Sequence, residues 1–172
     1  MDEFIQNSNQ LEEDQEKEEY KKAYNYCIFL LSKRDYSEFK ISNKLKSRKH
    51  SSKIIQDVVD QLTEQGYLRE DEYKKQRIKQ FILKGCSNRY IIQKLGVEHL
   101  DCEEEDIENI REEQFLSTDD MIDKLIEKKL RGKDIPEGFE EKQKLKNKVL
   151  RFLISKGHSF DHALPKLDTY FR

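Results

Sequence analysis

The stretch that decides the fold of this chain reads Lys84-Gly85-Cys86-Ser87, then Ile91, then Lys94-Leu95. Two further copies of the pattern read Arg34-Asp35-Tyr36-Ser37 with Ile41 and Lys44-Leu45, and Lys156-Gly157-His158-Ser159 with Ala163 and Lys166-Leu167. In each copy an apolar run precedes the basic residue, and a Lys-Leu pair ends eight residues after the serine. A repeated unit of this size indicates stacked supersecondary modules, whose surfaces mostly serve in binding.

The pattern has a physical cause in the way helices end and begin. The basic residue belongs in the last turn of a helix, where it favours the negative end of the helix dipole. Glycine, or Asp35 in the first copy, tolerates the left-handed backbone that reverses the chain. The serine then caps the next helix. Each copy therefore predicts a tight helix–turn–helix corner, with Ser37, Ser87 and Ser159 as N-caps.

Composition favours an all-α protein with a thin core. Of the 172 residues, 35% are hydrophobic and 40% are charged, and compact globular domains usually hold more apolar residues. Six Gly and two Pro fit helices joined by short corners, and no segment alternates apolar and polar residues as a strand does. We therefore expect tandem three-helix, helix–turn–helix-like repeats in an elongated, curved array.

Apolar spacing predicts a tail followed by modules. Residues 1–19 are acidic and predict a flexible tail, because the helical apolar stripe begins only at Tyr20. We expect residues 20–66 to form the first three-helix repeat and residues 67–115 the second. Its short helix is expected to stop at Gly96.

The second repeat is predicted to end in an acidic helix. This helix covers residues 101–114, and Asp101 and Glu104 have capping-box spacing at its start. Its few apolar anchors include Phe115.

The third repeat, residues 116–172, departs from the other two. Only 13 residues follow Ser159, too few for the third helix that follows the earlier corners. An added helix at residues 118–130 and a hinge near residues 131–138 account for the extra length before the corner. Pro136 and two of the six glycines lie in this hinge segment.

The formal net charge of −2 hides segregated blocks of charge. Residues 1–20 and 98–127 carry net charges of −7 and −11, whereas residues 21–97 and 128–172 carry +10 and +6. Such blocks fit charged faces that meet a partner. They equally fit acidic and basic helices that neutralise one another within the protein.

The sequence lacks the patterns of an enzyme. Cys27, Cys86 and Cys102 are odd in number and widely spaced, which argues against disulfides, and Cys27 reads as a small buried hydrophobe. His158 and His162 have the spacing of metal ligands on a helix, but no third ligand is suitably spaced nearby. No phosphate-binding glycine loop, nucleophile elbow or catalytic triad pattern occurs. We expect no catalysis, no cofactor and no metal.

The expected compartment is the cytoplasm. No apolar run reaches the length of about 18 residues that a membrane-spanning helix needs. The acidic start of the chain is also unlike a signal peptide.

Basic residues at equivalent places in the corners are the candidates for binding. Such residues could form a spaced basic ridge suited to a polyanion or to a polymer with acidic grooves. The alternative is that each belongs to a solvated helix face. With basic neighbours included, the candidate contacts are Lys33, Arg34, Lys44, Lys84, Arg89, Lys94, Arg151, Lys156 and Lys166.

Over about residues 20–171 the chain resembles the bacterial RecX family of regulatory proteins. The run from Leu30 to Ser37 with Lys44-Leu45 resembles the first module of that family. The second module of the family is resembled by Gly66-Tyr67-Leu68 with Tyr73, Lys84-Gly85, Ile91 and Leu95-Gly96-Val97. Its last module is resembled by the run from Phe152 to Ser159.

The resemblance implies a function as a modulator of RecA. Proteins of this family are expected to lodge in the helical groove of the RecA filament on single-stranded DNA, usually inhibiting ATP hydrolysis, strand exchange and co-protease activity. The expected partners are therefore the RecA filament and, by direct contact, DNA, with no membrane and with the chain as a monomer. A helix–turn–helix DNA-binding protein and a helical scaffold for another protein are the alternatives.

Overall fold

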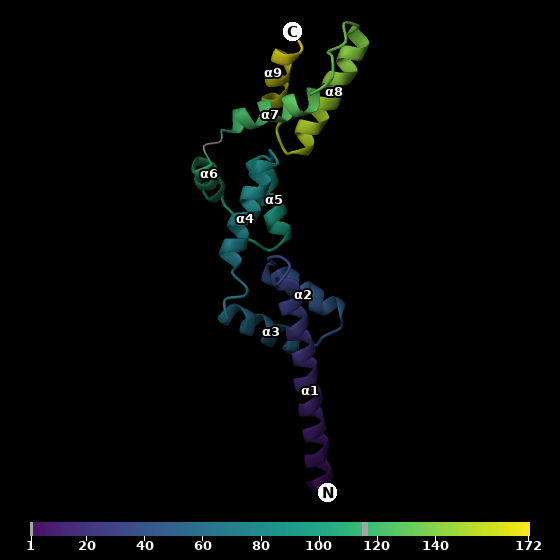
Figure 1. The fold of residues 1–172 in the computed structure, drawn as a ribbon, viewed down its shortest axis with the longest axis vertical. Helices are drawn as coiled ribbons and strands as arrows, with labels where there is room; N and C mark the ends of the chain where they lie inside the picture. The colour runs from purple at the N-terminus through teal and green to yellow at the C-terminus, as the bar shows by residue number, and fades with distance from the viewer. Residues whose placement is uncertain (1, 115–116) are drawn as a thin grey trace. The chain divides into compact units, whose positions relative to one another are not determined.

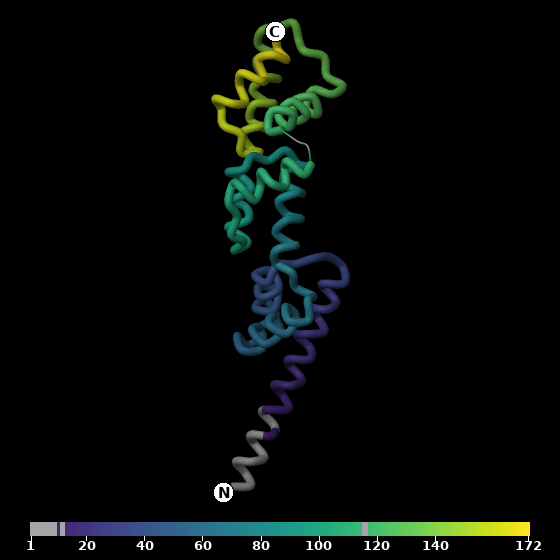
Figure 2. Tube along the Cα trace, turned by 90° about the vertical axis from the view of Figure 1, so that its left-hand side faces the viewer, coloured from purple at the N-terminus to yellow at the C-terminus, as the bar shows by residue number. Residues whose placement is uncertain are grey.

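The structure is a computed structural model that describes residues 2–114 and 117–172. Throughout these residues the regular elements are α-helices and no strand occurs (Figure 1), which confirms the all-α prediction. Figure 2 follows the same chain as a trace coloured from the N-terminus to the C-terminus. The helices are α1 (Asp2–Leu31), α2 (Glu38–Ser47), α3 (Ser52–Glu64), α4 (Glu70–Leu83), α5 (Asn88–Val97), α6 (Glu104–Glu113), α7 (Thr118–Leu130), α8 (Phe139–Ser155) and α9 (Phe160–Tyr170).

The chain divides into two compact units, Met1–Tyr73 and Lys74–Arg172. The predicted module boundaries at 66/67 and 115/116 stay predictions. Phe115, expected as an apolar anchor of the second module, lies outside the described residues.

In the first unit, α3 packs against both α1 and α2. Its buried core takes apolar side chains from all three helices, including Ala23, Cys27, Ile41, Leu45, Ile54, Val58 and Leu62. The hydroxyls of Ser37 and Ser51 accept hydrogen bonds from the backbone N–H groups of Lys40 and Ile54, and so cap α2 and α3. The predicted cap at Ser37 is confirmed.

Helix α1 begins at Asp2, well before Tyr20, where the helical apolar spacing starts. The flexible tail of residues 1–19 stays a prediction. The segment is rich in Glu and Gln, which favour helix without forming an apolar stripe. Ion pairs one turn apart support it, such as Lys22 to Glu18 at 3.6 Å. Glu19 also accepts a hydrogen bond from the Ser51 N–H at 3.3 Å, which connects α1 to the start of α3.

In the second unit, α7 packs against both α8 and α9, as α3 packs against α1 and α2. The predicted added helix at 118–130 is confirmed, and it completes a core with the two helices of the last corner. That core consists of Ile122, Leu125, Ile126, Val149, Leu150, Leu153, Ala163, Leu167 and Phe171. Within the described residues no third helix follows the corner at Ser159, and α7, which precedes that corner in sequence, takes the place of this helix in the core.

The helix ends differ from the predictions at several places. Gly85 and Gly157 have φ angles of 70° and 90° and reverse the chain as predicted, but Asp35 is not left-handed, so the first corner turns differently. Helix α5 continues past Gly96 to Val97 and ends before His99, whose φ is 57°. Lys49, at the equivalent place after α2, has a φ of 66°.

The start of the acidic helix also differs from the prediction. The N-cap of α6 is Glu103 rather than Asp101, and the Glu103 N–H donates to the Asp106 carboxylate at 3.1 Å. Because that carboxylate accepts the backbone hydrogen bond, the pKa of Asp106 is lowered.

Candidate functional site

The second and third corners pack against each other inside the second unit. The Ser87 N–H donates to the Lys156 carbonyl at 2.9 Å, and the Ser87 hydroxyl donates to the Gly157 carbonyl at 2.8 Å. In return, His158 Nε2 lies 2.9 Å from the Gly85 carbonyl oxygen. Because a carbonyl oxygen can only accept, His158 Nε2 carries the proton. Carbonyls at the ends of α4 and α8 are therefore satisfied by the opposite corner.

The packing around the two corners leaves no room for a larger side chain at either glycine. A Cβ atom added to Gly157 would lie 2.6 Å from Tyr90 Cβ, and one added to Gly85 would lie 2.7 Å from the Leu125 side chain. His158 is only 4% exposed, and this burial lowers its pKa, although the hydrogen bond to Gly85 opposes the shift. The corners are thus joined by a neutral, buried imidazole.

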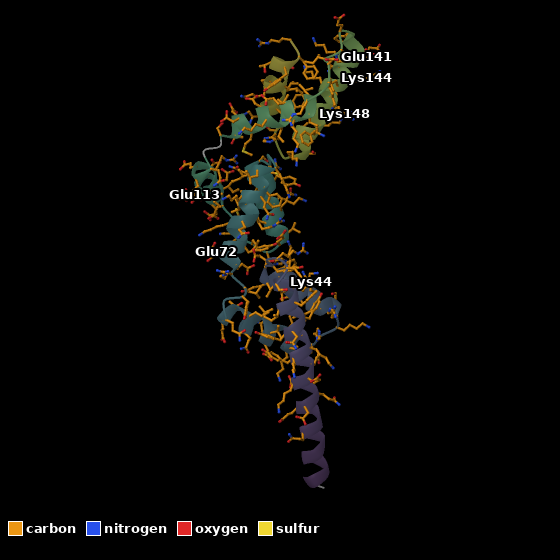
Figure 3. All side chains as sticks on the ribbon, viewed as in Figure 1. Lys44, Glu72, Glu113, Glu141, Lys144 and Lys148 are labelled. Atoms are coloured by element: carbon orange, nitrogen blue, oxygen red, sulfur yellow. The ribbon has the colours of Figure 1, made fainter. Side chains whose placement is uncertain are left out.

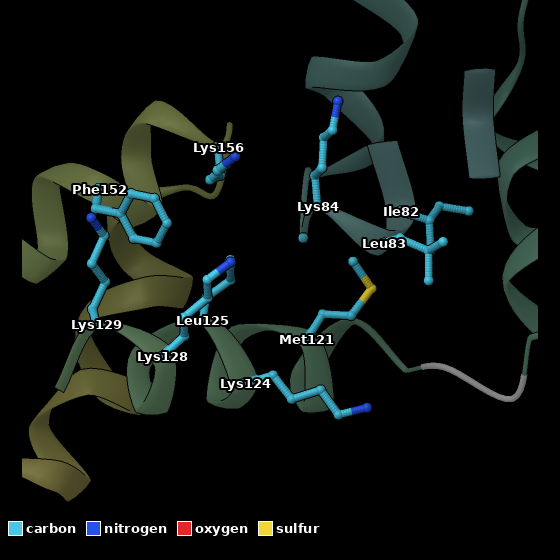
Figure 4. Close-up of a pocket in the computed structure, with 11 residues that line it drawn as sticks. Ile82, Leu83, Lys84, Met121, Lys124, Leu125, Lys128, Lys129, Phe152 and Lys156 are labelled. Atoms are coloured by element: carbon cyan, nitrogen blue, oxygen red, sulfur yellow. The ribbon is translucent and has the colours of Figure 1, made fainter. Parts of the chain in front are cut away.

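This packing brings Lys84 and Lys156 to one groove, which we call the basic groove (Figure 4). It encloses about 510 Å³ between the end of α4, one face of α7 and the end of α8. Its lining consists of Ile82, Leu83, Lys84, Gly85, Met121, Lys124, Leu125, Lys128, Lys129, Phe152 and Lys156. Five of these residues are lysines and none is acidic.

Aromatic rings hold several of the groove's lysines in place. Lys129 Nζ lies 4.1 Å from the centroid of the Phe152 ring, and Lys156 Nζ lies 5.7 Å from the same centroid. Lys84 Nζ lies 6.0 Å from the Phe81 centroid. Each such contact contributes about 0.5–1 kcal/mol at exposed sites. The basic groove therefore presents ammonium groups whose positions are partly fixed before any partner binds.

Two of the three predicted contacts of the first unit lie over one aromatic ring, that of Tyr36. Arg34 Nε donates to the Tyr36 hydroxyl at 2.8 Å, and its guanidinium lies 4.7 Å from the ring centroid. Lys44 Nζ lies 5.6 Å from the same centroid, and Lys33 contacts Phe29 instead. Two of these three candidates are thus brought together at the first corner.

Most of the other predicted contacts lie apart from the basic groove. Lys94 Nζ lies 5.3 Å from the Tyr90 centroid. Arg89 lines a separate hollow of about 740 Å³, which also contains Phe160. The Arg151 Nε donates to the Asn147 carbonyl on its own helix. These residues remain predicted contacts, and so does a continuous ridge along the whole chain.

Lys166 is less available than its equivalents Lys44 and Lys94. Its ammonium group lies 3.0 Å from an Asp123 carboxylate oxygen and 3.4 Å from one of Asp119. The hydrogen bond to Asp123 is the main cause of a raised pKa for Lys166. The third copy of the repeated lysine therefore ties α9 to α7.

Sequence reasoning missed Lys124, Lys128 and Lys129, because α7 lies outside the repeated corner. A signal was nevertheless present in the sequence. Met121, Lys124, Leu125, Lys128 and Lys129 recur with helical spacing and share one face of α7. A search for basic residues beside apolar ones on every predicted helix would have found them.

The cysteines and the histidine pair have ordinary surroundings. Cys27 is fully buried, as predicted, and burial raises the pKa of its thiol to about 11. His162 lies 3.0 Å from Asp119, whereas His158 contacts Gly85. Within residues 2–114 and 117–172, no group of three side chains has the arrangement of a metal site. Over the same residues, none of the helices combines the length and the apolar character needed to cross a bilayer.

Solved structures share this fold. A crystal structure of regulatory protein RecX superposes with a TM-score of 0.63 at 22% identity, covering 90% of this chain and 74% of the other. The crystal structure of RecX from Lactobacillus salivarius gives a TM-score of 0.58 at 17% identity, covering 88% and 98%. At such identities the likeness concerns the fold alone.

Sequence comparison identifies the family. Residues 23–62 match the family model described as RecX, first three-helix domain. The regulatory protein RecX of Vibrio vulnificus (strain CMCP6) is 30% identical over 135 residues, which covers 78% of this chain and 84% of the relative. That of Finegoldia magna is 35% identical over 146 residues, covering 82% and 68%. With these relatives and the three-helix architecture, the chain belongs to the RecX family of regulatory proteins.

Proposed function

We propose that this chain binds the RecA filament on single-stranded DNA in the cytoplasm and inhibits its ATP hydrolysis, strand exchange and co-protease activity. The observation that carries the proposal is membership of the RecX family, at 30% and 35% identity to relatives over most of the chain. The protein would act by binding, as a regulator and not as an enzyme. It would lie in the helical groove of the filament.

The charge distribution supports a nucleoprotein partner. A filament of protein on DNA presents phosphates and acidic side chains, and the basic groove offers five lysines to either. Among the nine predicted contacts, Lys84 and Lys156 are the strongest, because Lys124, Lys128 and Lys129 add to them. Lys166 is the weakest, because two carboxylates already pair with it.

The test is RecA ATP hydrolysis on single-stranded DNA, measured at increasing concentrations of this protein. We expect hydrolysis to fall with the parent protein. The double variant Lys124→Glu/Lys128→Glu should need about tenfold more protein for half-inhibition, which corresponds to about 1.4 kcal/mol of binding free energy. Both lysines are exposed, so the substitutions should not unfold α7.

A matched control is available on the other long helix of the same unit. Lys144 and Lys148 have the same spacing on α8, are exposed, and lie outside the basic groove (Figure 3). Lys144→Glu/Lys148→Glu should inhibit like the parent. Unchanged hydrolysis at micromolar parent protein would contradict the proposal. Tight, salt-sensitive binding to naked duplex would favour the DNA-binding alternative.

A further inference from the structure

The basic groove contains exposed apolar surface as well as charge. Leu83 is 65% exposed at its edge, and Phe152 is partly exposed. Met121 and Leu125 lie between them along the lining and are buried. Figure 4 shows Leu125 and Met121 on the α7 side of the groove, facing the segments that carry Lys84 and Lys156. An occupant would gain by burying the exposed apolar surface of Leu83 and Phe152.

The lysines have a regular arrangement around this apolar lining. On α7, Met121, Lys124, Leu125, Lys128 and Lys129 follow the spacing i, i+3, i+4, i+7 and i+8. At 1.5 Å per residue this face extends about 12 Å, or roughly two helical turns. Lys84 and Lys156 approach from α4 and α8. The lysines therefore extend over about the length of two turns of a helix bound in the groove.

The lining fits a protein segment better than a nucleic acid. Phosphates are bound most specifically by Arg, which forms two parallel hydrogen bonds, yet no Arg lines the groove. Single-stranded bases stack on open aromatic rings. The ring of Phe152 is already contacted by the ammonium groups of Lys129 and Lys156. Phosphates would also leave the exposed side chain of Leu83 without a complementary surface.

We infer that the basic groove docks an acidic amphipathic helix of a partner protein. Its apolar side chains would pack against Leu83 and the exposed part of Phe152, and its carboxylates would pair with the surrounding lysines. The lysine-rich lining, with no acidic member, selects for this occupant by charge. The inference deepens the proposed function. It rests on that function for the identity of the partner protein that carries the helix.

Binding of a model peptide tests the inference without RecA. The probe is a fluorescein-labelled peptide of about 15 residues, long enough for a marginal helix. Leucines occupy one face at i, i+4, i+7 and i+11 and glutamates flank them. The comparison peptide has the same composition in scrambled order. We expect fluorescence anisotropy in about 0.1 M salt to give a dissociation constant about tenfold lower for the amphipathic peptide.

Variants of the groove separate its two components. Leu83→Ala should weaken the amphipathic peptide several-fold and leave the scrambled one unchanged, since Leu83 is exposed and its loss leaves no core cavity. The double variant Lys124→Glu/Lys128→Glu should weaken the binding of both peptides. The control Lys144→Glu/Lys148→Glu should change the binding of neither. Equal binding of the two peptides would overturn the inference. So would displacement of the amphipathic peptide by an oligodeoxythymidylate of equal length at lower concentration.

The same variants distinguish failure of this inference from failure of the proposed function. If peptide binding depends on Leu83 but the protein has no effect on RecA, the groove is a helix-docking site and the proposed function is wrong. Inhibition of RecA by a protein that binds neither peptide preferentially would uphold the function and reject the groove as a helix-docking site.

Discussion

The residue before each capping serine is buried in all three corners, yet its chemistry differs each time. Tyr36, Cys86 and His158 are 6%, 3% and 4% exposed. Tyr36 gathers two basic side chains, Cys86 is a small apolar filler whose thiol pKa is raised by burial, and His158 bonds to the opposite corner. A single position thus adapts a repeated corner to three different neighbourhoods.

At Gly157 we expect a substitution to be costly for two separable reasons. Gly157→Ala forces a left-handed φ of 90° on alanine and places Cβ against Tyr90. Gly132→Ala is the control, because Gly132 has a φ of 70° with nothing within 4 Å of the added Cβ. The control should lose about 1 kcal/mol from strain, and Gly157→Ala about 3 kcal/mol because overpacking adds to it.

Urea unfolding followed by circular dichroism measures both variants. Equal losses of stability would mean that the corner relaxes around the new methyl group, which would contradict the close contact.

The buried imidazole of His158 predicts a pH dependence of stability. Burial lowers its folded-state pKa, and the charges of His162 and Arg111 lower it further. The unfolded chain therefore binds a proton more readily, so stability is fully present above the ordinary His pKa and falls as pH drops below about 6.5. His158→Gln can still donate to the Gly85 carbonyl but does not titrate.

Urea midpoints of parent and His158→Gln between pH 7.5 and pH 5.5 check this prediction. The parent should lose more stability over this interval than the variant. Identical losses would assign the pH dependence to other groups.

At the scale of elements, the helix starts show how one sequence signal yields unequal structures. Ser37 and Ser87 cap α2 and α5 through their hydroxyls, whereas Ser159 holds the N-cap position of α9 without a side-chain cap hydrogen bond. Ser87 alone of the three also donates to the opposite corner. The same residue at equivalent places in the motif therefore contributes different amounts to the stability of the fold.

Alanine substitutions should rank Ser87 and Ser159 against Ser51, the cap of α3. Ser51→Ala removes one side-chain cap hydrogen bond and should cost about 1 kcal/mol. Ser87→Ala removes a cap and the hydrogen bond to the Gly157 carbonyl, and should cost about 2 kcal/mol. Ser159→Ala should cost least. Thermal unfolding of the three variants measures the order, and a Ser159 variant as unstable as the Ser87 variant would refute it.

Local signals in the sequence were enough to predict the elements but not their assembly. Gly85, Ser87 and the apolar spacing of α7 act within a few residues, so their outcome could be foreseen. The contact of Ser87 with Gly157 joins residues 70 positions apart, and no local pattern encodes it.

The same limit applies to the basic groove. Lys84 and Lys156 were predicted from the repeat, but α7 adds its lysines only through tertiary packing. The early start of α1 was missed because charged helix formers and contacts such as Glu19 with Ser51 leave no apolar stripe.

At the scale of the whole molecule, two compact units each carry a buried core of their own. The first is built from α1, α2 and α3, and the last corner of the second from α7, α8 and α9. Core damage in one unit should therefore be felt mainly within that unit.

Matched core truncations test this independence. Leu62 and Leu153 are both fully buried, one in each unit. Leu62→Ala and Leu153→Ala should each cost about 3 kcal/mol. Hydrogen exchange should show lost protection in residues 2–73 for the first variant and in the described part of 74–172 for the second. Loss across both units from either substitution would show that they unfold together.

The reciprocal contact between the second and third corners has a consequence for how the second unit opens. Each glycine carbonyl accepts a hydrogen bond from a side chain of the other corner, so separating the corners breaks hydrogen bonds on both sides at once. We therefore expect the two corners to open together in a local unfolding event, and not one after the other.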